Sequence, residues 1–149
     1  MHRSDFITTP NMELHIEGDM VVIKNLNETS LDDLHIILDA YAKVRSRCGR
    51  TFALYDGRQG RGMSSAARKE LLAHTEDPNR TANASAVFGA PFAMRILVNM
   101  LDRALVGLRK RSLGIVMFET ESEARAYLDE QRQRLLRTKS LPTSQTAQV

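Results

Sequence analysis

The sequence predicts an α/β fold, a five-stranded mixed sheet with four helices, and three observations support this prediction. Short apolar runs alternate with longer segments in which apolar residues recur at helical spacing. The run Ala84–Phe88 is short and largely apolar, which is typical of an interior strand buried on both faces. Gly89 and Pro91 follow this run directly, and the long helical pattern after them completes a central strand–helix unit.

At the N-terminus, residues 1–11 are polar and aperiodic, so we expect a mobile tail before the domain. Met12–Ile16 alternates apolar and polar side chains, which indicates a half-buried edge strand, and Met20–Asn25 is the next strand. The connection Glu17–Asp19 is short and contains a glycine, as in a hairpin. We therefore expect an antiparallel N-terminal edge hairpin and parallel strands in the rest of the sheet.

The first helix is predicted from its two ends and from an apolar stripe. Thr29 or Ser30 can cap its N-terminus, and Gly49 is a typical C-terminal stop. The stripe consists of Leu31, Leu34, Ile37, Leu38, Tyr41 and Val44. Cys48, at the helix end, is predicted to be structural, and a reactive thiol activated by nearby arginines is the alternative. Because the chain has one cysteine, an internal disulfide and a multi-cysteine zinc motif are excluded.

The remaining elements alternate between strand and helix. They are a strand at Thr51–Tyr55, a helix from about Ser64 to His74, a strand at Ile115–Phe118 and a last helix ending near Arg137. Thr120 and Glu123 form a capping-box pattern at the start of this last helix. Together the elements predict a single domain over residues 12–137, followed by a polar C-terminal tail over residues 138–149.

The long helix after Pro91 carries three apolar residues outside its expected core face. Around Arg95 we expect a polar stripe. The core face opposite it is predicted to consist of Ala93, Leu97, Met100, Ala104 and Leu108. Phe92 and Val98 border the polar stripe, and Val106 lies along it. Scattered surface residues are the simpler interpretation, and an interface with a partner protein or a second copy is the alternative.

The composition is that of an ordinary globular protein. Hydrophobic residues make up 42% of the chain and charged residues 26%. The net charge of +3 is too small to indicate nucleic-acid binding. The N-terminus lacks the apolar segment of a signal peptide, and Arg95, Asp102 and Arg103 interrupt the long apolar stretch, so no membrane span is indicated. We therefore expect a cytoplasmic protein.

Three segments, VFGAPFAMRILVNMLDRAL, IVMFET and ESEARAYL, resemble the SpoIIAA-like fold that STAS domains share. In particular, the chain is similar to the small bacterial STAS/SEC14-type proteins over roughly Met12 to Leu136. The likeness lies in the order of the elements and in the acidic, alanine-rich closing helix, without a catalytic signature. The resemblance implies the fold, and it implies a regulatory module that binds a protein.

The same resemblance implies two kinds of site. In STAS anti-sigma-factor antagonists, the loop after the third strand carries a phosphorylatable serine at the start of the next helix. The matching residues here are Ser64 and Ser65, although a glycine-rich insertion separates them from Asp56. The SEC14 side of the likeness implies a pocket for an apolar, lipid-like ligand.

The loop between the third strand and the second helix is the best local candidate for a ligand site. The carboxyl ends of parallel strands and the N-termini of helices both favour ligands, especially anions. Glycines permit close backbone approach, and arginines bind phosphate or carboxylate with two donors. The predicted ligand-binding residues are Asp56, Gly57, Arg58, Gly60, Arg61 and Gly62. A flexible basic loop is the simpler alternative.

Catalysis has little support in the sequence. The four histidines are dispersed without metal-ligand spacing, and no cofactor motif is present. Asp56 can act as a base at a strand end, but no nucleophile is placed beside it. The sequence therefore favours a non-enzymatic regulatory module that binds a protein. A carrier of an anionic or apolar small molecule is the alternative, and an enzyme that uses Asp56 is the third hypothesis.

Overall fold

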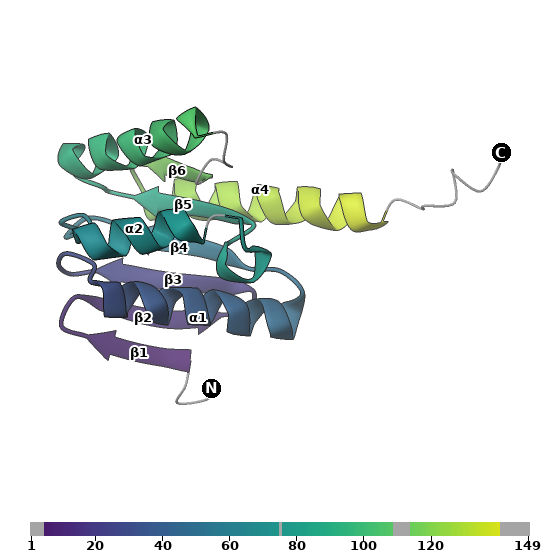
Figure 1. Ribbon diagram of the computed structural model, residues 1–149. Coiled ribbons are helices and arrows are strands. Elements are labelled where there is room, and N and C mark those ends of the chain that lie inside the picture. Colours follow the sequence, from purple (N-terminus) through teal and green to yellow (C-terminus); the bar gives the residue numbers. More distant parts are fainter. Residues whose placement is uncertain (1–4, 75, 109–113, 141–149) are drawn as a thin grey trace.

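A six-stranded sheet in the order β1-β2-β3-β4-β5-β6 runs through the computed structural model, which describes residues 5–74, 76–108 and 114–140 (Figure 1). The strands are β1 (Phe6–Thr9), β2 (Met12–Glu17), β3 (Met20–Asn25), β4 (Phe52–Asp56), β5 (Ala84–Phe88) and β6 (Ile115–Phe118). β1, β2 and β3 are antiparallel neighbours, whereas β3 to β6 are parallel. The mixed sheet, the hairpin between β2 and β3, and the interior position of β5 are confirmed.

The prediction of five strands is wrong by one. Phe6–Thr9, which was assigned to a mobile tail over residues 1–11, forms β1 and pairs with β2. Consequently β1, and not Met12–Ile16, is the edge strand on this side. All four of its residues are aromatic or β-branched, which suits a strand, but the segment is too short to show periodicity. Residues 1–4 of the expected tail lie outside the described residues.

Three helices cover one face of the sheet and a fourth covers part of the other (Figure 1). They are α1 (Leu31–Cys48), α2 (Ser65–Ala73), α3 (Phe92–Gly107) and α4 (Glu121–Ser140), and a 3-10 helix, η2 (Pro78–Arg80), follows α2. α1, α2 and α3 each connect neighbouring parallel strands, and crossovers of one hand place them on the same face. α4 packs on the opposite face against β4, β5 and β6. Residues 138–140 of the expected tail are thus helical, and residues 141–149 lie outside the described part.

The helix ends follow the local signals in the sequence. Ser30 caps α1 and forms a reciprocal capping box with Asp33, and Gly49 ends the helix with φ of 75°. Thr120 accepts a hydrogen bond from the backbone N–H of Glu123 at 3.2 Å, so it caps α4. These ends match the predictions because capping is decided by residues close together in the chain.

The two faces of the sheet are packed differently. α1 buries its apolar stripe on β2 and β3, and α4 buries Ala124 and Leu128 on β4 and β5. α3 buries only Leu105 among its sixteen residues. Its predicted core face is wrong in part, since Met100 and Leu108 are 63% and 65% exposed. Periodicity alone could not choose a face, because this helix is apolar over most of its circumference. In the part of the chain described, no helix is long and apolar enough to cross a membrane.

Candidate functional site

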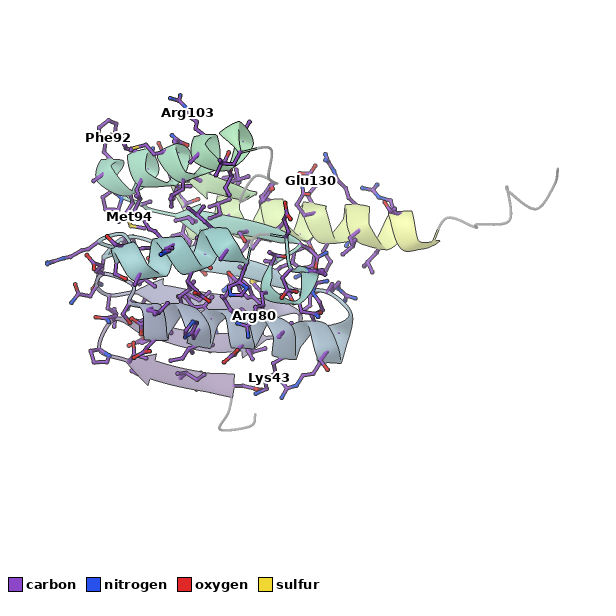
Figure 2. The ribbon with its side chains drawn as sticks, in the orientation of Figure 1. Lys43, Arg80, Phe92, Met94, Arg103 and Glu130 are labelled. Carbon is purple, nitrogen blue, oxygen red and sulfur yellow. The ribbon has the colours of Figure 1, made fainter. Side chains whose placement is uncertain are left out.

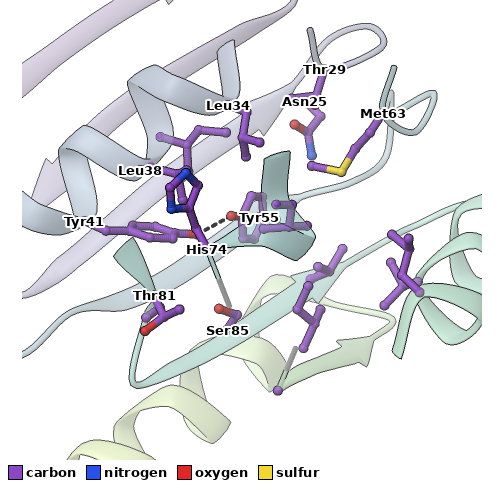
Figure 3. A pocket seen from close by; sticks show the side chains of 18 of the residues that line it. Asn25, Thr29, Leu34, Leu38, Tyr41, Tyr55, Met63, His74, Thr81 and Ser85 are labelled. Atoms are coloured by element: carbon purple, nitrogen blue, oxygen red, sulfur yellow. Dashed lines mark hydrogen bonds between the residues drawn. The ribbon is translucent and has the colours of Figure 1, made fainter. Parts of the chain in front are cut away.

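A cavity of about 190 Å³ lies between the sheet and helices α1, α2 and α3 (Figure 3). Most of its wall is apolar. α3 contributes Met94, Leu97, Val98 and Leu101, which recur at the spacing of one helix face. Figure 2 shows Met94 pointing from α3 toward the body of the protein and Phe92 pointing away from it. The cavity therefore explains why so little of α3 is buried.

Three hydroxyl groups make the cavity wall polar at one place. Tyr41 of α1 and Tyr55 of β4 point toward one another and share a hydrogen bond (Figure 3). Ser85 of β5, which also lines the cavity, supplies the third hydroxyl group. Burial raises the pKa of Tyr55 to about 12. Burial and the neighbouring Tyr55 raise the pKa of Tyr41 well above its ordinary value. Both phenols are therefore uncharged hydrogen-bonding groups at neutral pH.

Among the described residues that line the cavity, two side chains are basic, and each of them faces an acidic partner. His74 follows α2, and its Nε2 lies 2.6 Å from a carboxylate oxygen of Glu70. The hydrogen bond with His74 holds the pKa of Glu70 below its usual value. Arg80 of η2 lies 3.8 Å from Asp39 of α1. These groups belong to the rim of the cavity, where η2 packs on α1.

The rim between η2 and β5 is held by Arg45 of α1. Its guanidinium donates to the backbone oxygen of Thr81 and to Oδ1 of Asn83, both at 3.1 Å. The same Oδ1 accepts from the backbone N–H of Thr51 at 2.8 Å. Asn83 and Gly114 line the cavity and are exposed, so the cavity is open to solvent on this side.

The Asp56 loop lies at the carboxyl edge of the sheet, before α2, but its carboxylate is already engaged. Arg58 donates to both oxygens of Asp56, at 3.0 and 2.7 Å, and its backbone N–H donates at 3.1 Å. These hydrogen bonds hold the pKa of Asp56 below its usual range. The guanidinium of Arg58 also lies 5.6 Å from the centre of the Phe88 ring. The geometry therefore leaves Asp56 poorly placed to act as a base.

Glycines of this loop have a packing role. A Cβ at Gly60 would overlap the sulfur of Met94, and one at Gly62 would lie 3.1 Å from Cδ2 of Leu97. Gly62 also has φ of 86°, which favours glycine. The loop can therefore pass close to the inner face of α3. This contact accounts for two glycines without an anion, and the six predicted ligand-binding residues of the loop stay a prediction.

The two serines after the loop differ in accessibility. Ser64 is half-buried and accepts a hydrogen bond from the backbone N–H of Ala67 at 3.1 Å, as the cap of α2. Ser65 is exposed, and its Oγ accepts from Arg68 at 3.1 Å. Phosphorylation at either position stays a prediction.

The three predicted interface residues are not brought together on one surface. Phe92 and Val106 are 77% and 61% exposed on α3. Val98 lines the cavity instead. Ile96 and Met100, at 43% and 63% exposed, are the further large apolar residues on the outer side of α3.

The sequence did not predict the polar part of the cavity wall, which is formed by Tyr41, Tyr55 and Ser85. Tyr41 was assigned to the apolar stripe of a helix, and Tyr55 and Ser85 to strands. A buried tyrosine needs a partner for its hydroxyl, and this requirement was the available signal. It could not identify the partners, because α1, β4 and β5 meet only in the folded chain.

Structural comparison decides the fold. The structure of the anti-sigma factor antagonist SpoIIAA in its unphosphorylated form matches with a TM-score of 0.53, over 81% of this chain and 97% of that one, at 15% sequence identity. The protein has a SpoIIAA-like fold. An uncharacterized protein of the DUF3478 family with a SpoIIAA-like fold, from Shewanella loihica PV-4, gives a TM-score of 0.49 over 78% of this chain and 91% of that one, at 15% identity. No protein-family model matches the sequence, and a search of curated proteins gives no significant match.

The match confirms the SpoIIAA-like fold that the sequence resemblance implies. At this level of identity, the likeness establishes the fold and leaves the function to be argued from the site. Among the described residues, no group of three or more histidine, cysteine, aspartate or glutamate side chains is placed to hold a metal ion.

Proposed function

We propose that the protein is a non-enzymatic binding module that holds a small, mainly apolar molecule in the cavity between α1, α2, α3 and the sheet. The observation that carries this proposal is the cavity itself, of about 190 Å³. Protein interiors leave few voids larger than a water molecule. A concave, mainly apolar site with a few converging polar groups is the usual form of a small-molecule site.

The packing of α3 supports the same proposal. Met94, Leu97 and Leu101 face the cavity but are only partly buried. A ligand would remove their apolar surface from water, at a gain of about 25 cal/mol per Å². Ligand binding therefore explains why these apolar side chains face inward, although the protein core does not bury them.

A pair of substitutions on α3 tests the proposal. Val98→Trp places a large ring in the cavity, whereas Ile96→Trp adds the same ring on the exposed side of the helix. The apolar probe α-methylstyrene is titrated into each protein and followed by NMR. We expect saturable binding by wild type and by Ile96→Trp, and an affinity about ten-fold lower or worse for Val98→Trp. No binding by wild type, or equal affinity in all three proteins, contradicts the proposal.

A second candidate is a regulatory module that binds a protein through the outer side of α3. It is supported by the exposure of Phe92, Met100 and Val106, at 77%, 63% and 61%. The likeness to an anti-sigma factor antagonist is in keeping with it, although a fold can serve many functions. An enzyme that uses Asp56 gains no support, because Arg58 occupies both carboxylate oxygens.

A further inference from the structure

We infer that the occupant of the cavity is an uncharged molecule of roughly eight to ten non-hydrogen atoms. Its single carbonyl oxygen accepts a hydrogen bond from the hydroxyl cluster, which consists of the cavity-lining hydroxyl groups of Tyr41, Tyr55 and Ser85. Aryl ketones, aromatic aldehydes and small esters belong to this class. The inference rests on the proposed function, because it names the chemistry of the ligand for the same cavity.

The volume sets the size of the ligand. A dry apolar cavity of about 150 Å³ is known to hold one benzene molecule. The cavity here measures about 190 Å³, so it admits one ring with a small substituent. It lies below the roughly 300–1,000 Å³ of pockets that enclose drug-sized ligands. A whole phospholipid chain is therefore too large to be enclosed.

Counting protons in the hydroxyl cluster gives the polarity of the ligand. Tyr41 and Tyr55 each carry one O–H donor, and their mutual hydrogen bond uses one of these two protons. Ser85 adds a third hydroxyl group to the same cavity wall. One phenol donor therefore remains, at Tyr41 or at Tyr55, and both of these residues line the cavity. A ligand that fills the remaining, mainly apolar space satisfies this donor with an acceptor oxygen.

The electrostatic surroundings exclude a charged ligand. Both tyrosines stay protonated at neutral pH, so they can donate but cannot pair with a cation. Of the described residues that line the cavity, the basic ones are His74 and Arg80, which face Glu70 and Asp39. A carboxylate beside the tyrosines would therefore be buried without a counter-charge, which is costly. A neutral carbonyl group meets the available donor without that cost.

Three probes of similar size separate shape, polarity and charge. Acetophenone carries the carbonyl oxygen, α-methylstyrene replaces this oxygen by a methylene group, and benzoate carries a negative charge. Dissociation constants are measured for each probe with wild-type protein. We expect acetophenone to bind about ten-fold tighter than α-methylstyrene, because only acetophenone satisfies the spare donor. We expect benzoate to bind more weakly than either neutral probe.

Variants then assign the preference to the hydroxyl cluster. The triple variant Tyr41→Phe/Tyr55→Phe/Ser85→Ala removes donors and acceptors together, which can leave stability nearly unchanged. It should bind α-methylstyrene with the wild-type affinity, and it should bind acetophenone no more tightly than α-methylstyrene. Tyr127→Phe, on α4 at the opposite face, is the matched control and should retain the wild-type preference. If the triple variant does not fold, Tyr41→Phe, Tyr55→Phe and Ser85→Ala are measured singly, and at least one must lose the preference.

The outcomes distinguish this inference from the proposed function. Equal binding of acetophenone and α-methylstyrene by wild type overturns the ligand class and leaves cavity binding intact. Tightest binding of benzoate overturns the exclusion of charge. A preference that survives in every hydroxyl variant shows that another group recognises the oxygen, and it overturns the inference as well. Binding of none of the three probes overturns the proposed function itself.

Discussion

Asp33 shows how a single side chain can join two elements. Its carboxylate accepts hydrogen bonds from the hydroxyl of Thr9 and the side-chain amide of Asn11, both at 2.8 Å. The same carboxylate accepts from the backbone N–H of Ser30 at 3.0 Å, as part of the cap of α1. Asp33 is buried, so these bonds are shielded from water. One residue therefore ties the turn between β1 and β2 to the start of α1.

We predict that Asp33→Ala lowers the free energy of unfolding by about 2–3 kcal/mol, because it removes a cap and leaves buried donors unpaired. Asp32→Ala is the control, since Asp32 is exposed in the same first turn. It should cost about 0.5–1 kcal/mol through the helix dipole alone. Urea unfolding measures both values, and equal losses would contradict the role of Asp33 as a link between elements.

Among the elements, α4 is fastened to the turn between β2 and β3 by two arginines. Arg125 lies 2.9 Å from Glu17, and Arg132 lies 2.8 Å from Asp19. The guanidinium of Arg132 is also 5.3 Å from the centre of the Phe52 ring. These contacts cross the back of the sheet and join segments far apart in the sequence. They add ion pairs to the apolar packing of α4.

The pair of Arg125 and Glu17 makes α4 sensitive to acid. Hydrogen bonds from Arg125 and His15 lower the pKa of Glu17 from 4.5 to about 2. A depressed carboxyl pKa contributes stability that is fully present above the unfolded value and is lost as the pH falls through the folded value. We predict that stability falls between about pH 4.5 and 2, and that Arg125→Ala weakens this dependence. The midpoints of urea unfolding, measured across this pH range for wild type and for Arg125→Ala, test this pH dependence.

Arg134→Ala is the control for this pH dependence. Arg134 pairs with Glu130 on the exposed side of the same helix, where the two side chains are 63% and 57% exposed. An exposed pair of this kind contributes little to stability. A pH profile that changes equally in the Arg125 and Arg134 variants would contradict the assignment to Glu17.

The outer side of α3 leads to a prediction about association. Phe92, Met100 and Val106 are large, apolar and exposed. If this side meets a second copy, Val106→Glu should shift the protein toward monomer, because it places a charge in an apolar contact. Sedimentation velocity measures the shift, and Gln133→Glu, at an exposed position of α4, is the control. A wild type that is monomeric at high concentration contradicts self-association.

At the scale of the whole molecule, the predictable parts of the fold are those with local signals. β5 is predictable because Ala84–Phe88 is a short, largely apolar run followed by Gly89 and Pro91, and α1 because Ser30 and Gly49 mark its ends. β1 was missed because a four-residue edge strand has too few residues for a pattern. The inward face of α3 and the cluster of Tyr41, Tyr55 and Ser85 at the cavity depend on contacts between distant segments. No spacing in the sequence records such contacts.

The fold also explains why the cavity lies where it does. α1 and α4 cover opposite faces and each completes a packed core. α2 and α3 are left to cover β4, β5 and β6 on the near side (Figure 1). α2 is short and buries only Ala67, and α3 buries only Leu105. The space that they fail to fill is the cavity, and a ligand would complete the core on this side.

Methionine methyl groups provide the most direct test of cavity binding. Met63 and Met94 line the cavity, whereas Met100 is exposed on the outer side of the same α3 helix that carries Met94. In protein labelled with carbon-13 at the methionine methyl groups, acetophenone is titrated and each signal is followed. The predicted result is that the signals of Met63 and Met94 shift together to saturation with one dissociation constant, while that of Met100 stays in place. Unshifted signals at Met63 and Met94, or a shift confined to Met100, would contradict a ligand-binding cavity.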